Sequence, residues 1–130
     1  AQTVAGLKIQ FKMLKELLKK SQFTLSQSIK IYVPSTSDVN KTVDNSQYVE
    51  KVQSKLSVLF GGSTTTNGIG TWVSEQVGLV KESVKIVQSF TDEKSLNKNI
   101  DEIILICEEL KTDMKQEGIS LEIQGEFYVI

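Results

Sequence analysis

Two hydrophobic periodicities alternate along residues 27–130, and their order restricts the fold more than any other feature of the chain. Apolar residues at every second position predict strands with one buried face, and spacings of three and four residues predict amphipathic helices. The predicted order is strand, helix, strand, strand, helix, strand, at residues 29–33, 45–60, 63–75, 84–90, 95–117 and 121–129. This is the order of the split βαβ arrangement. We therefore predict an α+β domain over residues 27–130 with a ferredoxin-like βαββαβ core.

Glycines mark the turns and helix ends of this core. Gly61 and Gly62 end the first helix, and Gly78 lies in the turn that joins two strands into a hairpin. Gly118 is expected to give the second helix a left-handed stop. In a ferredoxin-like sheet both helices cover one face, so the other face is expected to be open. By alternation, that open face should carry Lys30, Tyr32, Lys85, Val87, Gln124, Glu126 and Tyr128.

Residues 1–26 form a separate basic segment, predicted as an additional amphipathic helix over residues 3–20 and a connector. Its apolar stripe consists of Val4, Leu7, Phe11, Leu14 and Leu18. Residues 1–30 hold six lysines and one acidic residue, a net charge of +5, whereas residues 31–130 carry −6. The simplest interpretation is a helix packed on the body. A partner-binding or self-associating helix, and a membrane-surface or nucleic-acid helix, are the alternatives.

Missing residue types exclude several kinds of chemistry. The chain has no histidine, so it contains neither a Ser-His-Asp triad nor an HExxH metal site. It has no arginine, which removes bidentate recognition of phosphate. The single cysteine, Cys107, excludes an internal disulfide and is expected to be buried and inert. Glu109 and Asp113 are expected to be solvated, so we predict no metal and no cofactor.

The glycine-rich and threonine-rich segment 60–72 has the composition of a phosphate-binding loop but not its context. A phosphate loop precedes a helix and carries GxxxxGK[ST], whereas this segment follows a helix and leads into a strand. We interpret it as a helix stop followed by a bent strand.

A short motif over residues 60–90 does resemble a known family. It consists of Gly70-x-Trp72, the turn glycine Gly78, and Lys81-Glu82 leading into an apolar strand. The pattern is similar to a family of short uncharacterised bacterial proteins, a domain of unknown function, and to small proteins of low-GC bacteria, their phages and plasmids. The resemblance implies no activity.

Trp72 and Glu82 are the residues most suited to a special role, since they flank the hairpin. A glutamate beside a buried tryptophan can act as an acid or base, but it more commonly fixes the turn through backbone N–H groups. The candidate ligand-binding residues are Thr66, Trp72, Glu82 and Lys85. Tyr32 and Tyr128 are expected to be neighbours on the open sheet face.

Our leading hypothesis is a non-enzymatic cytoplasmic accessory protein that acts through protein–protein association, with no catalytic residues and an origin in a phage or plasmid. We expect a homo-oligomer, a dimer as the first choice, and neither a membrane nor a nucleic acid as partner. The candidate interface residues are Leu7, Phe11, Leu14, Leu18, Tyr32 and Tyr128. The first alternative is a small-molecule-binding protein or small enzyme that uses the hairpin and the open face. The second is nucleic-acid binding through the lysine-rich helix.

Overall fold

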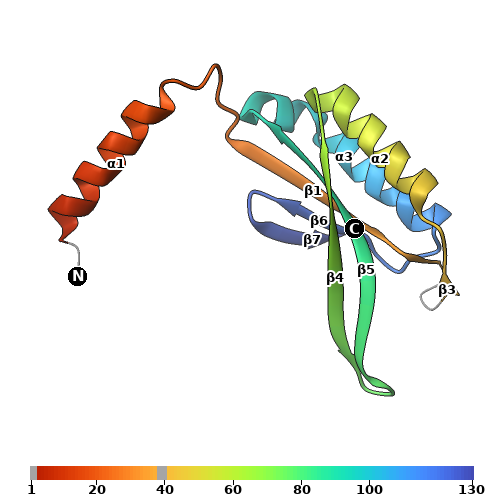
Figure 1. The fold of residues 1–130 in the computed structure, drawn as a ribbon. Helices are drawn as coiled ribbons and strands as arrows, with labels where there is room; N and C mark the ends of the chain where they lie inside the picture. The colour runs from red at the N-terminus through yellow and green to blue at the C-terminus, as the bar shows by residue number, and fades with distance from the viewer. Residues whose placement is uncertain (1–2, 38–40) are drawn as a thin grey trace.

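The structure, a computed structural model, describes residues 3–37 and 41–130 and has a mixed α+β fold (Figure 1). Its helices and strands are α1 (Val4–Leu18), β1 (Gln27–Pro34), β2 (Thr36–Ser37), β3 (Lys41–Thr42), α2 (Ser46–Phe60), β4 (Thr64–Ser74), β5 (Gly78–Thr91), α3 (Glu93–Asp113), β6 (Ser120–Ile123) and β7 (Glu126–Val129). The predicted α+β class is confirmed.

Five of the strands form one antiparallel sheet in the order β4-β5-β1-β6-β7. The short strands β2 and β3 pair with each other in a separate ribbon. Helices α2 and α3 lie side by side on one face of the large sheet, and β4 and β5 extend as a long hairpin beyond the body (Figure 1). No described helix covers the opposite face, which we call the open face.

The hydrophobic core lies between the sheet and the two helices. Ile29, Ile31 and Val33 of β1 point toward the helices and are completely buried. They pack with the apolar sides of α2 and α3, so that one cluster holds the body together. Full burial of such a side chain contributes about 1.5–3 kcal/mol relative to exposure. Cys107 is part of this core, which confirms the predicted burial of the cysteine, and desolvation raises the pKa of its thiol to about 12.

The helices begin and end close to the predicted positions. Gly61 has a φ of 89°, which confirms the left-handed end of α2. The carboxylate of Asp92 accepts a hydrogen bond from the backbone N–H of Ser95 at 2.7 Å, so α3 begins at Glu93 rather than at Ser95. The stop predicted at Gly118 is wrong, because the left-handed residue after α3 is Lys115, with a φ of 53°.

Gly118 instead permits a close approach of the two chain segments that follow α3. A Cβ atom at this position would lie 2.5 Å from Cγ1 of Val129 and 3.5 Å from the carbonyl oxygen of Ile130. The same segments are joined by paired backbone hydrogen bonds of 3.0 and 2.9 Å between Ile119 and Ile130. Glycine is therefore required here for space and not for its backbone conformation.

The last predicted strand is wrong, because residues 121–129 form two strands. Gln124 and Gly125 both have positive φ, 53° and 80°, and make the tight turn between β6 and β7. Ile123 pairs with Glu126, so these two residues lie on the same face of the sheet. The odd-numbered residues of β6 point toward the helices, whereas the odd-numbered residues of β7 point toward the open face. Phe127, rather than Tyr128, therefore lies on the open face next to Tyr32.

The faces predicted for β5 are also wrong. Val33 pairs with Lys85 and Ile31 with Val87, so Lys85 and Val87 point toward the helices. Val87 is completely buried in the core. Val84 and Ile86 occupy the open face instead. The alternation could not assign the faces because both sides of this strand carry apolar residues.

The N-terminal helix is present as predicted, but its packing is not. None of the residues of α1 is buried, and the helix stands away from the sheet and from α2 and α3 (Figure 1). The interpretation of α1 as a helix packed on the body is therefore wrong. Within the described residues, no helix combines the length and the hydropathy needed to cross a bilayer.

The close approach at Gly118 predicts a specific loss of stability. Gly118→Ala is expected to lower the free energy of unfolding by about 1–3 kcal/mol, because the stiff side chain of Val129 must move to admit the methyl group. The measurement is urea unfolding followed by circular dichroism. Gly62→Ala is the matched control, because a Cβ there meets no atom within 4 Å, and it should change stability by less than about 0.5 kcal/mol. Equal stability of the two variants would contradict the prediction.

Candidate functional site

The base of the β4–β5 hairpin is hollowed on the open face because two strand residues have no side chain. In β4, residues of even number face the open side, and Gly68 and Gly70 occupy two successive positions of this set. They pair with Val84 and Glu82 of β5. Bare backbone therefore forms part of the floor, and a ligand can approach it more closely than an ordinary strand allows.

Aromatic side chains surround this floor and make a cavity of about 550 Å³. Trp72 comes from β4, Tyr32 from β1 and Phe127 from β7, and all three line the cavity. The rings of Tyr32 and Phe127 meet edge to face, with centroids 6.3 Å apart. We call this space the open-face cavity. Its size is typical of small-molecule sites, and its walls are mainly apolar.

Glu82 is the only charged side chain among the described residues that line the open-face cavity. Its Oε1 atom accepts a hydrogen bond of 2.9 Å from the hydroxyl of Thr36 in β2. The backbone carbonyl of Thr36 in turn accepts a hydrogen bond of 2.7 Å from the side-chain amide of Gln116. This chain of contacts orients the carboxylate by one oxygen, so the second oxygen can serve a cationic or hydrogen-bond-donating ligand.

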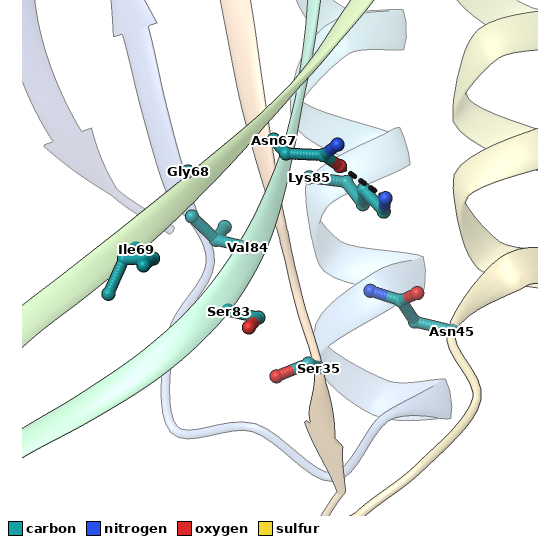
Figure 2. A pocket seen from close by; sticks show the side chains of 8 residues that line it. All are labelled: Ser35, Asn45, Asn67, Gly68, Ile69, Ser83, Val84 and Lys85. Carbon is teal, nitrogen blue, oxygen red and sulfur yellow. Dashed lines mark hydrogen bonds between the residues drawn. The ribbon is translucent and has the colours of Figure 1, made fainter.

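The same two strands border a second, more polar cavity of about 580 Å³ on the helix side of the sheet (Figure 2). Lys85 donates a hydrogen bond to the side-chain oxygen of Asn67, its partner across the hairpin. Asn45 extends from the start of α2 and donates a hydrogen bond of 2.9 Å to the carbonyl of Pro34. Gly68, Ile69 and Val84 line both cavities, so only the ribbon of β4 and β5 separates them.

The structure brings together only part of the predicted ligand-binding set. Trp72 and Glu82 line the open-face cavity, two positions apart along the register of the hairpin. Thr66 faces the same side, opposite Ile86, but does not line that cavity. Lys85 lies on the other face, in the cavity of Figure 2.

Four residues that shape this site were not predicted from the sequence. They are Gly68, Gly70, Thr36 and Phe127. The two glycines are separated by one residue in a strand, and this spacing alone indicates a bare patch on one face of a sheet. Thr36 and Phe127 approach the site only through the tertiary fold, so no local pattern identifies them.

The acidic residues of α3 belong to the helix surface and not to the site. Glu109 contacts Lys55 of α2 at 2.6 Å and Lys51 at 3.5 Å, and Asp113 lies 3.9 Å from Lys51. The hydrogen bond from Lys55 holds the pKa of the Glu109 carboxyl below its usual range. Within the described part of the chain, no group of three acidic or cysteine side chains is placed to hold a metal ion.

Two solved structures share this fold. A phage SAM lyase in its apo state superposes with a TM-score of 0.63 and 20% identity, over 85% of this chain and 93% of the lyase chain. A phage SAM lyase in complex with S-methyl-5′-thioadenosine gives a TM-score of 0.60 and 17% identity, over 85% and 95%. No protein-family model and no curated protein matches the sequence.

This similarity corrects the leading hypothesis from the sequence. The solved structures that share the fold are those of an enzyme, so the hypothesis of a non-enzymatic protein acting through protein–protein association is wrong. The first alternative, a small-molecule-binding protein or small enzyme that uses the hairpin and the open face, agrees better with these structures.

Because Gly70 has no side chain, we predict that a larger residue at this position can fill part of the open-face cavity without lowering the stability of the protein. A Cβ atom at position 70 meets its nearest atom, the carbonyl oxygen of Glu82, at an ordinary distance of 3.8 Å. Gly70→Val is therefore expected to keep or raise the free energy of unfolding, by up to about 1 kcal/mol, because valine favours strands. Urea unfolding is the measurement. Gly78→Val is the contrasting variant, since φ is +80° there and a loss of stability is expected. A large loss for Gly70→Val would contradict the described floor.

Proposed function

We propose that the protein is a lyase that cleaves S-adenosylmethionine (SAM) and that the open-face cavity binds this substrate. The observation that carries the proposal is the composition of the cavity, with aromatic walls, a backbone floor and one carboxylate. The fold that it shares with the phage SAM lyases gives independent support. A backbone floor and a single oriented carboxylate suit a ligand that is partly flat and partly cationic.

The aromatic walls fit the two distinctive parts of SAM. The adenine ring can stack on an indole or phenol ring, and a sulfonium cation is attracted by the faces of aromatic rings. Trp72 is half-exposed, at 51%, and Phe127 is 62% exposed, so both rings have surface left for a ligand. A volume of about 550 Å³ lies within the range of sites that enclose cofactor-sized molecules.

We assign Glu82 to the substrate's ammonium group rather than to its sulfonium. The sulfonium charge disappears during C–S cleavage, so a carboxylate bound to it would stabilise the substrate more than the transition state. The ammonium charge is retained throughout. Glu82, held by Thr36, can therefore anchor the amino-acid end without slowing the reaction.

The reaction requires no histidine. In the proposed step the bond between sulfur and the γ-carbon of the amino-acid part breaks, and its electron pair stays on sulfur. The sulfur becomes a neutral thioether and leaves as S-methyl-5′-thioadenosine, the compound bound in one of the similar structures. The amino-acid fragment completes its valence in one of two ways: an oxygen of its own carboxylate bonds to the γ-carbon in place of the sulfur and closes a ring, or its β-carbon gives up a proton to a water molecule and a C=C bond forms. Because the leaving sulfur takes up no proton, no general acid is needed, which fits this chain.

The decisive test is turnover of SAM by the purified full chain, with S-methyl-5′-thioadenosine detected by liquid chromatography and mass spectrometry. Glu82→Gln is expected to lower kcat/KM by about tenfold or more, through loss of an ionic contact worth about 1.4 kcal/mol. Gly70→Val should abolish both turnover and binding, because its side chain occupies the floor of the cavity.

Two further measurements make this test specific. Glu75→Gln removes a carboxylate at the exposed turn of the same hairpin, outside the open-face cavity, and should leave kcat/KM unchanged. Binding of S-methyl-5′-thioadenosine without turnover of SAM would leave a small-molecule-binding protein in place of the lyase. Absence of both binding and turnover would refute the proposal.

The finer fold assignment belongs to this proposal. We propose that β1, β4, β5 and β6 with α2 and α3 form a ferredoxin-like plait, to which β7 and α1 are additions. The strand order β4-β5-β1-β6 supports it, since the first and third strands of the series are adjacent at the centre. The cytoplasm is the proposed location, because a single cysteine fits a reducing compartment.

A homo-oligomer is also part of the proposal. Beyond the body, the hairpin exposes Ile69, Val73 and Leu79 on the side of the sheet opposite the open face, and Val77 at its turn. An isolated two-stranded arm is marginally stable in water, so contact with a second copy would stabilise it. Analytical ultracentrifugation should show a species larger than the monomer, and Val73→Ser with Leu79→Ser should shift it to the monomer. A monomer at all concentrations would refute this part.

A further inference from the structure

Helix α1 exposes an unusual amount of apolar surface for a helix with no partner in the structure. Eight large apolar side chains between Val4 and Leu18 have exposures from 49% to 70%. The helix has no buried residue, and the body has a complete core without it. An isolated helix of this length is marginal in water, so α1 needs a surface that covers its apolar side.

The lysines of α1 are confined to a narrow strip. At 3.6 residues per turn, Lys8, Lys12 and Lys15 of α1 and Lys19 at its C-cap fall within a sector of about 60°. Lys15 lies against Phe11, with its ammonium 5.1 Å from the ring centroid, and marks one border of the strip. The rest of the circumference is mainly apolar. Ile9 and Met13 lie about 100° or more around the helix from the stripe formed by Leu7, Phe11 and Leu14, and Leu17 lies between that stripe and Met13.

This distribution does not suit pairing with a second copy of α1. A two-stranded coiled coil covers a narrow seam, which would leave Ile9 and Met13 in water. Lys8 and Lys15 lie on one flank of that seam, and the other flank carries the uncharged Gln10 and Leu17. Glu16, the one acidic residue of the helix, is already paired with Lys19 at 2.9 Å. A second α1 therefore supplies no negative charge for the lysines.

We propose that α1 is an interfacial helix that lies on a lipid surface with anionic headgroups. A wide apolar arc that enters the acyl boundary and a strip of lysines at the headgroups are the features of such helices. The net charge of +4 over residues 1–26 is complementary to an anionic surface, whereas the body, residues 27–130, carries −5 and is not attracted to it. A helix on a bilayer surface needs no spanning segment. The predicted division of the chain at residue 26 then separates a surface anchor from the α+β body.

The test uses the full chain and two kinds of vesicle, phosphatidylcholine alone and phosphatidylcholine with an equal part of phosphatidylglycerol. In flotation assays the protein should move with the anionic vesicles only, and added salt should release it. Lys8→Gln with Lys12→Gln should weaken binding by about thirtyfold. Lys94→Gln with Lys98→Gln, at the same spacing on exposed positions of α3, is the matched control and should bind like the unmodified chain.

A second pair of variants separates a lipid surface from other partners. Ile9→Ser with Met13→Ser changes the apolar arc away from the seam and leaves all the lysines in place. A lipid surface requires this arc, so vesicle binding should fall by about tenfold or more. These exposed positions contribute nothing to the core, so folding of the body is unaffected.

Three results would overturn the proposal. The first is equal binding to both kinds of vesicle, because the lysines would then have no role. The second is no binding to either, together with an oligomer that Leu7→Ser and Leu14→Ser disrupt, which identifies a second copy as the partner. The third is salt-sensitive binding to duplex DNA that the Ile9→Ser and Met13→Ser changes leave intact. This proposal does not rest on the lyase proposal, since vesicle binding and SAM turnover are measured separately.

Discussion

The complete burial of one face of β1 determines the arrangement of the rest of the structure. β1 is hydrogen-bonded on both edges, to β5 and to β6, and Ile29, Ile31 and Val33 point into the core. Because the side-chain period of a strand is two, a slip of one residue in this strand would expose all three. The same period places Tyr32 on the open face, between β5 and β6. The position of an aromatic wall of the cavity thus follows from the burial of its two neighbours in sequence.

Much of the fold was predictable, and the errors have local causes. The strand at residues 29–33, the helix end at Gly61 and the presence of a hairpin near Gly78 each have a strong local pattern, and each is confirmed. The second strand of that hairpin begins at Gly78 itself and not at residue 84, so the turn is shorter than predicted. The face of β5 was not predictable, because Val84 and Val87 have opposite orientations and the same hydropathy. The turn at residues 124–125 was not predictable from the alternation, because the apolar residues on both sides of it, Ile123 and Phe127, have odd numbers.

The candidate site was predictable only where its residues lie close together in sequence. Trp72 and Glu82 belong to one hairpin, so their proximity follows from the turn between them. Thr36 contacts Glu82, which is 46 positions away in the chain, and Phe127 of β7 contacts Tyr32 of β1 across the one intervening strand, β6. The packing of the core and the pairing of the strands create these two contacts, and neither can be recognised in a short stretch of sequence. The absence of histidine was also readable from the sequence, but it restricts only the chemistry of the site and does not indicate where the site lies.

The aromatic wall of the open-face cavity has a consequence for how this protein can be observed. Trp72 is the only tryptophan of the chain, and it is half-exposed at the cavity. The intrinsic fluorescence of the whole molecule, excited at the red edge where tyrosine does not absorb, therefore comes from one position. A molecule that enters the cavity changes the polarity around this indole directly. The protein thus carries its own optical probe at the place where its chemistry is proposed, and no label has to be introduced.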